Sequence, residues 1–135
     1  MTKHKEDLPK YKGKGSTRVI IGGSEKFDKP KLMKKKMNLL TIKLGHIEVV
    51  SSGQITRTGK KHDDWMGAAR HGEMWATKYA DRYWCYAAYG IEKYELMAEF
   101  ADVAVIFYGK NKDDETKRLL QAIKKAKLPL RIIRY

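Results

Sequence analysis

Three glycine-bearing turns follow apolar runs in this chain, and their residue types suit the binding of a phosphate group. They are Gly22-Gly23-Ser24, Ser52-Gly53 and Gly109. Glycine lets a ligand approach the backbone closely, while backbone amides and hydroxyl groups donate hydrogen bonds to phosphate oxygens. We therefore expect a phosphorylated ligand to bind at these turns, with Thr116 as a further hydroxyl donor and Lys26 or Arg70 as the cation.

The same turns exclude the best-known nucleotide motifs. Neither GxGxxG nor GxxxxGK[ST] is present, so no dinucleotide fingerprint or Walker loop is indicated. The four histidines show no metal-ligand spacing, and we interpret His62-Asp63-Asp64 as a solvated helix cap rather than a metal site. Cys85 is the only cysteine and is expected to be a packed thiol. No catalytic residue, metal or cofactor is predicted.

The charge of the chain points to anionic partners. Lysine and arginine number 29 against 16 acidic residues, giving a net charge of +13. Residues 1–60 hold 15 basic and 5 acidic side chains, whereas residues 61–135 hold 14 and 11. Such a field attracts nucleic acid or small anions. The residues that we expect to contact a polynucleotide are a flexible arm over residues 1–17 and Lys31, Lys34, Lys35, Lys36, Arg57, Lys60 and Lys61.

Apolar periodicity predicts the elements that position these groups. One long helix over about 64–88 accounts for the aromatic spacing from Trp65 to Tyr86, although a break near Arg82 with a strand in YWCYAAY is the alternative. Pro30 opens a helix that ends near Gly45. Further helices are expected at 94–100 and 115–127, and strands at 19–21, 46–51, 103–108 and 130–133.

Alternating strands and helices predict an α/β fold, a three-layer Rossmann-like domain with a mostly parallel sheet of four to five strands. It would occupy residues 18–135 as a single domain. In such sheets ligands bind beyond the carboxyl ends of the strands. The polar loops at 22–28, 51–62 and 109–115 would all lie at that edge.

Several segments resemble the SLOG superfamily, especially its small YspA-like members, which are related to DprA and to LOG phosphoribohydrolases. Gly23-Ser24-Glu25-Lys26-Phe27-Asp28 is similar to the first turn of that family, with Glu25 where the family has arginine. Arg70, Glu73 and Tyr79 fit the helix after the second strand in register. Ala101–Phe107 resembles the third strand, and the similarity spans about residues 18–133.

The resemblance implies a Rossmann-like fold that holds a nucleotide or a related phosphorylated ligand, with Glu73 added to the site. Tyr108-Gly109-Lys110-Asn111 lacks the Pro-Gly-Gly-x-Gly-Thr loop that LOG enzymes need. We therefore expect a non-catalytic binding domain. Whether Gly53 or Gly67 occupies the ligand loop is open.

Two other functions fit the sequence. One is a basic protein that binds single-stranded DNA or RNA, as in the DprA branch. The other is a small phage or mobile-element protein that docks on a host protein, for which exposed Met33, Met37, Trp65 or Trp84 would be the supporting sign. No apolar run is long enough for a membrane span, and no secretory signal is evident. We therefore expect a cytoplasmic protein that can self-associate.

Overall fold

The computed structural model describes residues 16–53, 56–57, 65–110 and 113–135 of the chain. Its main feature is a sheet of five parallel strands in the order β5-β2-β1-β6-β7. The prediction of an α/β, Rossmann-like fold is confirmed. The strands are β1 (Thr17–Gly23), β2 (Ile47–Ser51), β5 (Arg82–Cys85), β6 (Val103–Tyr108) and β7 (Leu130–Arg134).

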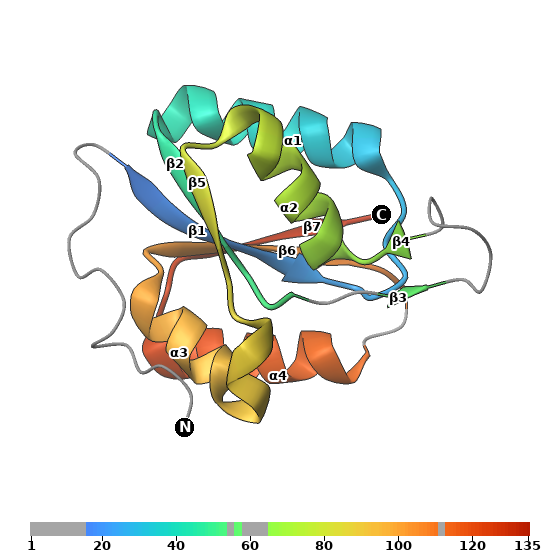
Figure 1. Cartoon of the computed structure of the whole chain (residues 1–135), viewed down its shortest axis with the longest axis vertical. Coiled ribbons are helices and arrows are strands. Elements are labelled where there is room, and N and C mark those ends of the chain that lie inside the picture. The colour runs from blue at the N-terminus through green and yellow to red at the C-terminus, as the bar shows by residue number, and fades with distance from the viewer. Residues whose placement is uncertain (1–15, 54–55, 58–64, 111–112) are drawn as a thin grey trace.

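Helices cover both faces of the sheet, which makes three layers (Figure 1). One face carries α1 (Pro30–Leu44) and α2 (Ala68–Tyr79). The other face carries α3 (Lys93–Phe100) and α4 (Asp114–Ala126), and a 3-10 helix, η2 (Ala87–Glu92), leads into α3. None of the described helices is both long enough and apolar enough to cross a bilayer.

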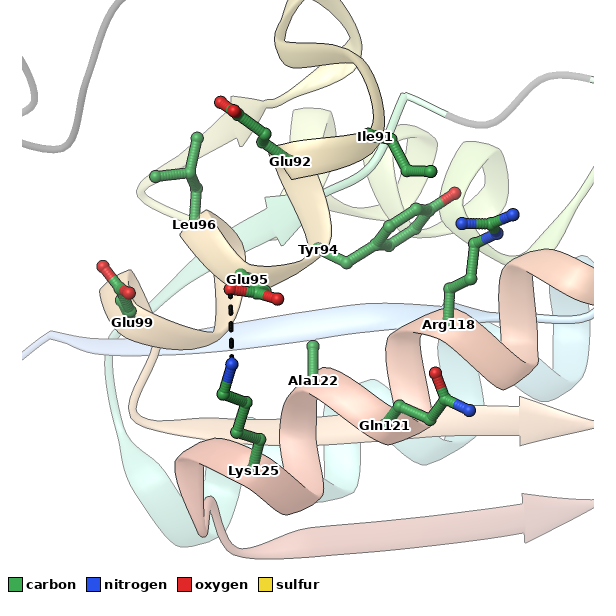
Figure 2. Close-up of a pocket in the computed structure, with 10 residues that line it drawn as sticks. All are labelled: Ile91, Glu92, Tyr94, Glu95, Leu96, Glu99, Arg118, Gln121, Ala122 and Lys125. Carbon is green, nitrogen blue, oxygen red and sulfur yellow. Dashed lines mark ion pairs between the residues drawn. The ribbon is translucent and has the colours of Figure 1, made fainter.

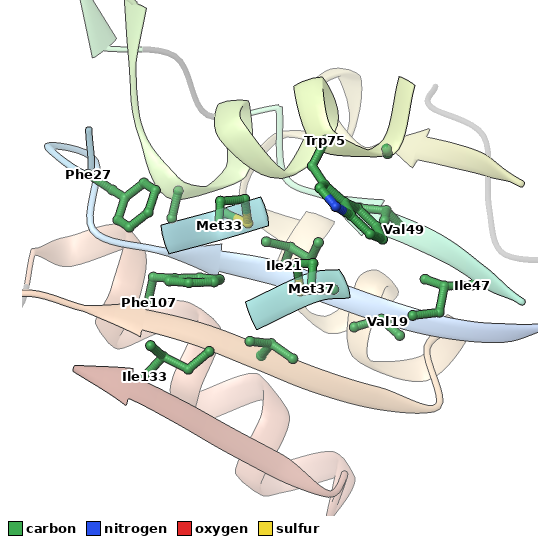
Figure 3. Close-up of a cluster of buried hydrophobic side chains, with 13 residues drawn as sticks. Val19, Ile21, Phe27, Met33, Met37, Ile47, Val49, Trp75, Phe107 and Ile133 are labelled. Carbon is green, nitrogen blue, oxygen red and sulfur yellow. The ribbon is translucent and has the colours of Figure 1, made fainter. Parts of the chain in front are cut away.

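The central strand β1 contributes to both cores because its side chains alternate between the two faces. Val19 and Ile21 pack under α1 and α2, while Ile20 belongs to the core on the α3 and α4 side. Figure 3 shows Met33 and Met37 of α1 lying over this first cluster. Both methionines are buried, as their four-residue spacing in an amphipathic helix requires.

The predicted helix over 64–88 is wrong, and the alternative with a break is closer to the structure. Helix α2 ends at Tyr79, and Arg82–Cys85 then forms the edge strand β5. Its partner is β2, with Glu48 opposite Arg82 and Ser51 opposite Cys85. Hydrogen bonding to an existing strand therefore outweighs the helical spacing of the aromatic residues.

A second, antiparallel pair of short strands was not predicted. Strand β3 (Thr56–Arg57) pairs with β4 (Trp65–Met66) just before α2. The expected cap at Asp63 or Asp64 lies outside the described residues, and α2 instead starts after Gly67, without a side-chain cap. Residues 1–15 of the predicted basic arm also lie outside them, whereas Thr17 already belongs to β1.

Candidate ligand site at the carboxyl edge of the sheet

The carboxyl ends of the strands gather most of the buried polar side chains. Among the described residues, the buried polar and charged ones are eight, and only Arg18 and Glu48 lie at the amino-terminal edge. The chain leaves β1 and β6 toward opposite faces of the sheet, which makes their carboxyl ends the topological switch point where such sheets bind ligands. The other six buried polar residues lie at the carboxyl ends of β1 and β2 or in the first turns of α2 and α4: Ser24, Ser51, Ser52, His71, Glu73 and Thr116.

Two of the predicted glycines are required by the fold itself. Gly23 has a φ of 135°, and a Cβ atom there would lie 2.1 Å from the carbonyl oxygen of Phe107. Gly53 has a φ of 76°, and its Cβ would meet Ala87 at 2.4 Å. An L side chain at either position would be strained and would clash. The fold alone thus explains these two glycines. The absence of a side chain at each position also leaves space for a ligand.

Glu73 is the acceptor of a first network, on the α2 side of the sheet. Its Oε2 accepts a 2.5 Å hydrogen bond from the hydroxyl of Ser51, and its Oε1 lies 3.8 Å from the Arg70 guanidinium. Cys85, at the end of β5, is also hydrogen-bonded to Glu73. The pKa of its thiol is raised chiefly by desolvation and further by this carboxylate. Cys85 is solvent-exposed, and the predicted packed thiol is wrong in this respect.

Glu115 is the acceptor of a second network, on the α4 side. Its Oε2 accepts a 2.6 Å bond from the Ser52 hydroxyl, and its Oε1 accepts a 2.6 Å bond from Tyr94. Burial and this bond raise the pKa of the Tyr94 phenol, so the phenol stays protonated and donates. Successive residues of a strand end face opposite sides, which is why Ser51 and Ser52 reach different carboxylates.

Tyr94 connects this network to a groove between α3 and α4. The groove has a volume of about 570 Å³, and Figure 2 shows Tyr94 pointing along it toward Arg118. Its α3 wall carries Glu95 and Glu99, while Lys125 extends from the α4 wall to within 3.7 Å of Glu95. The lining carries both acidic and basic side chains, which makes the groove a poor phosphate site. The groove nevertheless adds space beside the carboxyl edge of the sheet.

Asp113 occupies the position that a phosphate would take at the start of α4. Its Oδ1 accepts hydrogen bonds from the amide and the hydroxyl of Thr116, at 2.8 and 2.7 Å. Its Oδ2 accepts a 2.7 Å bond from the amide of Glu25, in the turn after β1. The helix N-terminus and the first glycine turn therefore already share a carboxylate, and a phosphate there would have to displace it.

Ser24 is held in the same way by the protein. Its amide donates to the carbonyl of Phe107 at 3.0 Å, its carbonyl accepts from the amide of Ala68, and its hydroxyl accepts from the amide of Lys26 at 3.2 Å. The side chain of Tyr135 also bonds to Ser24, and this phenol lies against Gly109. Ser24 is thus a structural junction between the ends of β1 and β6 and the start of α2.

The predicted site residues divide into two groups in space. All ten predicted ligand residues lie at or beside the carboxyl edge, with Lys26 exposed and Arg70 partly buried. Gly53 and Gly67, the two candidates for the ligand loop, are both near this edge, since Gly53 follows β2 and Gly67 precedes α2. The lysines of the predicted polynucleotide site lie on α1, which packs on one face of the sheet, and the side chains of Arg57, Lys60 and Lys61 lie outside the described residues.

Sequence reasoning included Glu73 but missed the other two acceptors of the site, Asp113 and Glu115. Asp113 precedes a helix and has the residue type of an N-cap, so its local role was available from the sequence. Glu115 is paired with Ser52 across 63 residues, and no local signal points to that contact. The sequence predicts Ser51 in a strand and Tyr94 in a short helix, and gives neither a role in the site.

His71 is buried at the start of α2 beside Phe27, with Nε2 3.7 Å from the Asp28 carboxylate. Burial lowers the pKa of its imidazole, which favours the neutral form. Across the described residues, no three histidine, cysteine, aspartate or glutamate side chains are placed to hold a metal ion.

No family model matches the chain, and no curated protein matches it significantly. The resemblance to the SLOG superfamily therefore stays a prediction, as do the cytoplasmic location and self-association.

Proposed function

We propose that the protein binds a phosphorylated nucleotide or nucleotide-derived ligand at the carboxyl edge of the sheet and does not catalyse a reaction on it. One observation carries the proposal: Glu73 and Glu115, from opposite layers, each accept a hydroxyl group at the carboxyl end of β2, next to the switch point of the sheet, at 2.5 and 2.6 Å. Carboxylates that already bind the hydroxyls of Ser51 and Ser52 are suited to exchange them for those of a ribose.

The charges around the edge favour one orientation of such a ligand. The sugar would face Glu73 and Glu115, because their carboxylates repel phosphate. The phosphate would face outward to Lys26 and Arg70, the cations nearest the first turn and the Glu73 network. The groove beside Tyr94 supplies volume for the remainder of the ligand.

The test begins with the purified protein after a high-salt wash. Its A260/A280 ratio is measured, and any small molecule that is released on denaturation is identified by mass spectrometry. Calorimetric titration then compares ribonucleotides with their 2′-deoxy forms. A hydrogen bond to a charged group is worth about 1.5–3 kcal/mol, so the loss of one ribose hydroxyl should weaken binding roughly 10- to 100-fold.

Glu115→Gln and Glu73→Gln should each weaken ribonucleotide binding by a similar factor. Asp114→Asn is the matched control, since Asp114 is exposed at the start of the same helix as Glu115. The proposal fails if no small nucleotide is released and no ribonucleotide binds at millimolar concentration. It also fails if the ribose and deoxyribose forms bind equally.

We propose single-strand nucleic-acid binding as the second candidate function, on the basis of how charge divides between the two faces. Helices α1 and α2 carry seven lysines and arginines and one acidic residue, the buried Glu73. Helices α3 and α4 carry five basic and four acidic residues. A polyanion would therefore meet the α1 and α2 face.

Exposed aromatic rings accompany these cations. Tyr79, at the end of α2, is 46% exposed, and Lys34 Nζ lies 5.8 Å from the centre of its ring. Tyr83 on β5 is also exposed, and strand alternation places it on the α2 face because Trp84 packs with the opposite core. Rings beside cations suit the stacking of unpaired bases.

Fluorescence anisotropy with a labelled dT20 oligonucleotide tests this candidate at several salt concentrations. The logarithm of the association constant should fall with a slope of several per decade of salt. Lys31→Glu/Lys35→Glu should weaken binding and flatten that slope, whereas Lys117→Glu/Lys124→Glu on α4 should change neither. Equal effects of the two pairs would refute a binding face on α1 and α2.

A further inference from the structure

A groove runs between α1 and the edge strand β7, on the side of α1 that faces away from α2. Two adjoining cavities of about 180 and 240 Å³ form it, and they share Leu40, Lys43, Val105 and Arg131. The floor is apolar, and the side chains at its rim include the cations Lys36, Lys43 and Arg131. Among the residues that the structure describes, no acidic one lines either cavity.

The backbone of β7 forms the open border of this groove. Within the part of the chain that the structure describes, β7 pairs with β6 on one side and with no strand on the other. The carbonyl of Pro129 and the amide of Tyr135 bond to β6, at 2.9 and 3.3 Å. Because a strand directs alternate residues to its two neighbours, the odd-numbered residues of β7 face β6.

The even-numbered residues therefore direct their amides and carbonyls outward. These are Leu130, Ile132 and Arg134, which together offer a row of donors and acceptors to a further strand. Ile132 is 39% exposed, and Leu39 on the facing side of α1 is 55% exposed. An added strand would thus find apolar contacts as well as backbone hydrogen bonds.

The charges around the groove decide between possible occupants. A second copy of this chain would bring another net charge of +13 and would set its own Arg131 and Arg134 beside these ones. A polynucleotide has no peptide backbone, whose regularly spaced N–H and C=O groups would pair with the strand edge. An extended segment of a protein that carries acidic and large apolar side chains satisfies the backbone, the floor and the cationic rim together.

We propose that the β7 edge and the α1/β7 groove bind an extended acidic segment of a partner protein as a sixth strand of the sheet. Its main chain pairs with Leu130, Ile132 and Arg134. Its side chains on the α1 side meet Leu39 and the lysine rim, and those on the opposite side meet Ile132. This surface lies apart from the nucleotide site and from the α2 flank of α1.

The experiment selects binders for the full chain from a displayed library of random twelve-residue peptides. Selected peptides are synthesised with a fluorophore and titrated by anisotropy. We expect them to be enriched in aspartate and glutamate alternating with Val, Ile, Leu or aromatic residues. Binding should protect the amides of Leu130, Ile132 and Arg134 from hydrogen exchange.

Two variants of different kinds test the site. Ile132→Pro removes an amide that the sheet does not use, so binding should weaken at least tenfold while the circular dichroism spectrum is kept. Lys36→Glu/Lys43→Glu leaves the β7 backbone intact and should also weaken binding at least tenfold. The matched pair Lys117→Glu/Lys124→Glu on α4 should leave the affinity within a factor of two.

Three results would overturn the proposal. One is a library that yields no binders, or binders without acidic enrichment. Another is unchanged affinity in both groove variants. The third is a concentration-dependent dimer in sedimentation that Ile132→Pro abolishes, which would assign the edge to a second copy of the chain.

Discussion

Replacing Asp113 by alanine should destabilise the protein and at the same time turn the start of α4 into an anion site. The carboxylate accepts three hydrogen bonds, from the Thr116 amide, the Thr116 hydroxyl and the Glu25 amide, at 2.7–2.8 Å. Losing an N-cap typically costs about 1 kcal/mol. The bond to Glu25 adds about 1 kcal/mol, because it is charge-assisted but exposed.

The expected loss is therefore about 2 kcal/mol of unfolding free energy. For a chain of this size that lowers Tm by roughly 6–10 °C. Urea unfolding followed by circular dichroism in a chloride buffer measures it. The matched control is Asp114→Ala, one residue further along α4 and exposed, which should cost less than about 0.5 kcal/mol.

Inorganic phosphate should then distinguish the variant from the wild type. In Asp113→Ala the amides of Glu25 and Thr116 lose their carboxylate partner and can bind phosphate at the helix N-terminus. At 50 mM phosphate and constant ionic strength, the variant should regain part of its lost stability, and the wild type should change little. A loss below 0.5 kcal/mol, or equal stabilisation of both proteins by phosphate, would refute the reasoning.

Three further predictions concern other described groups. Glu48→Gln should destabilise the protein by about 1.5–3 kcal/mol in urea unfolding, because it removes the carboxylate that lies 4.0 Å from the buried Arg18 guanidinium, which keeps its hydrogen bond to the carbonyl of Phe100. Glu73→Gln should speed the alkylation of Cys85 by iodoacetamide at pH 8, since the carboxylate contributes to raising the thiol pKa; an unchanged rate would contradict this. The free energy of unfolding should fall as the pH is lowered from 7 to 5, because His71 binds a proton near pH 6.5 in the unfolded chain and only at lower pH in the folded one. His71→Gln should reduce the slope of the unfolding free energy against pH by at most about 1.4 kcal/mol per pH unit.

The fold could be predicted because its three central strands, β2, β1 and β6, are buried runs that end at glycine or polar turns. Val103–Tyr108 is such a run, and it forms β6 as expected. The segment after Tyr79 could not be assigned in the same way. Its aromatic residues satisfy both a helical and a strand pattern, and the choice depends on whether β2 is available as a partner, which is a tertiary fact.

The position of the candidate site could be predicted from the sequence, but most of its hydrogen-bond acceptors could not. The glycines and serines of the turns are at one edge, as the parallel sheet requires. Which groups accept their hydrogen bonds depends on how α2 and α4 are rotated about their axes, and that rotation is set by core contacts such as Leu119. The prediction that the Thr116 hydroxyl donates to a phosphate did not include Asp113, whose carboxylate accepts a hydrogen bond from that hydroxyl.

The consecutive serines Ser51 and Ser52 restrict where a single ligand can contact both carboxylates. Their hydroxyls reach Glu73 on the α2 side and Glu115 on the α4 side, so the sheet itself separates the two acceptors along most of its length. A ligand confined to the groove between α3 and α4 would contact only the Glu115 network, through Tyr94. Only beyond the last residues of β1 and β2 does the sheet no longer intervene. A ligand whose affinity falls in both Glu73→Gln and Glu115→Gln must therefore bind at the strand ends, whereas one sensitive to Glu115→Gln alone must bind in the groove.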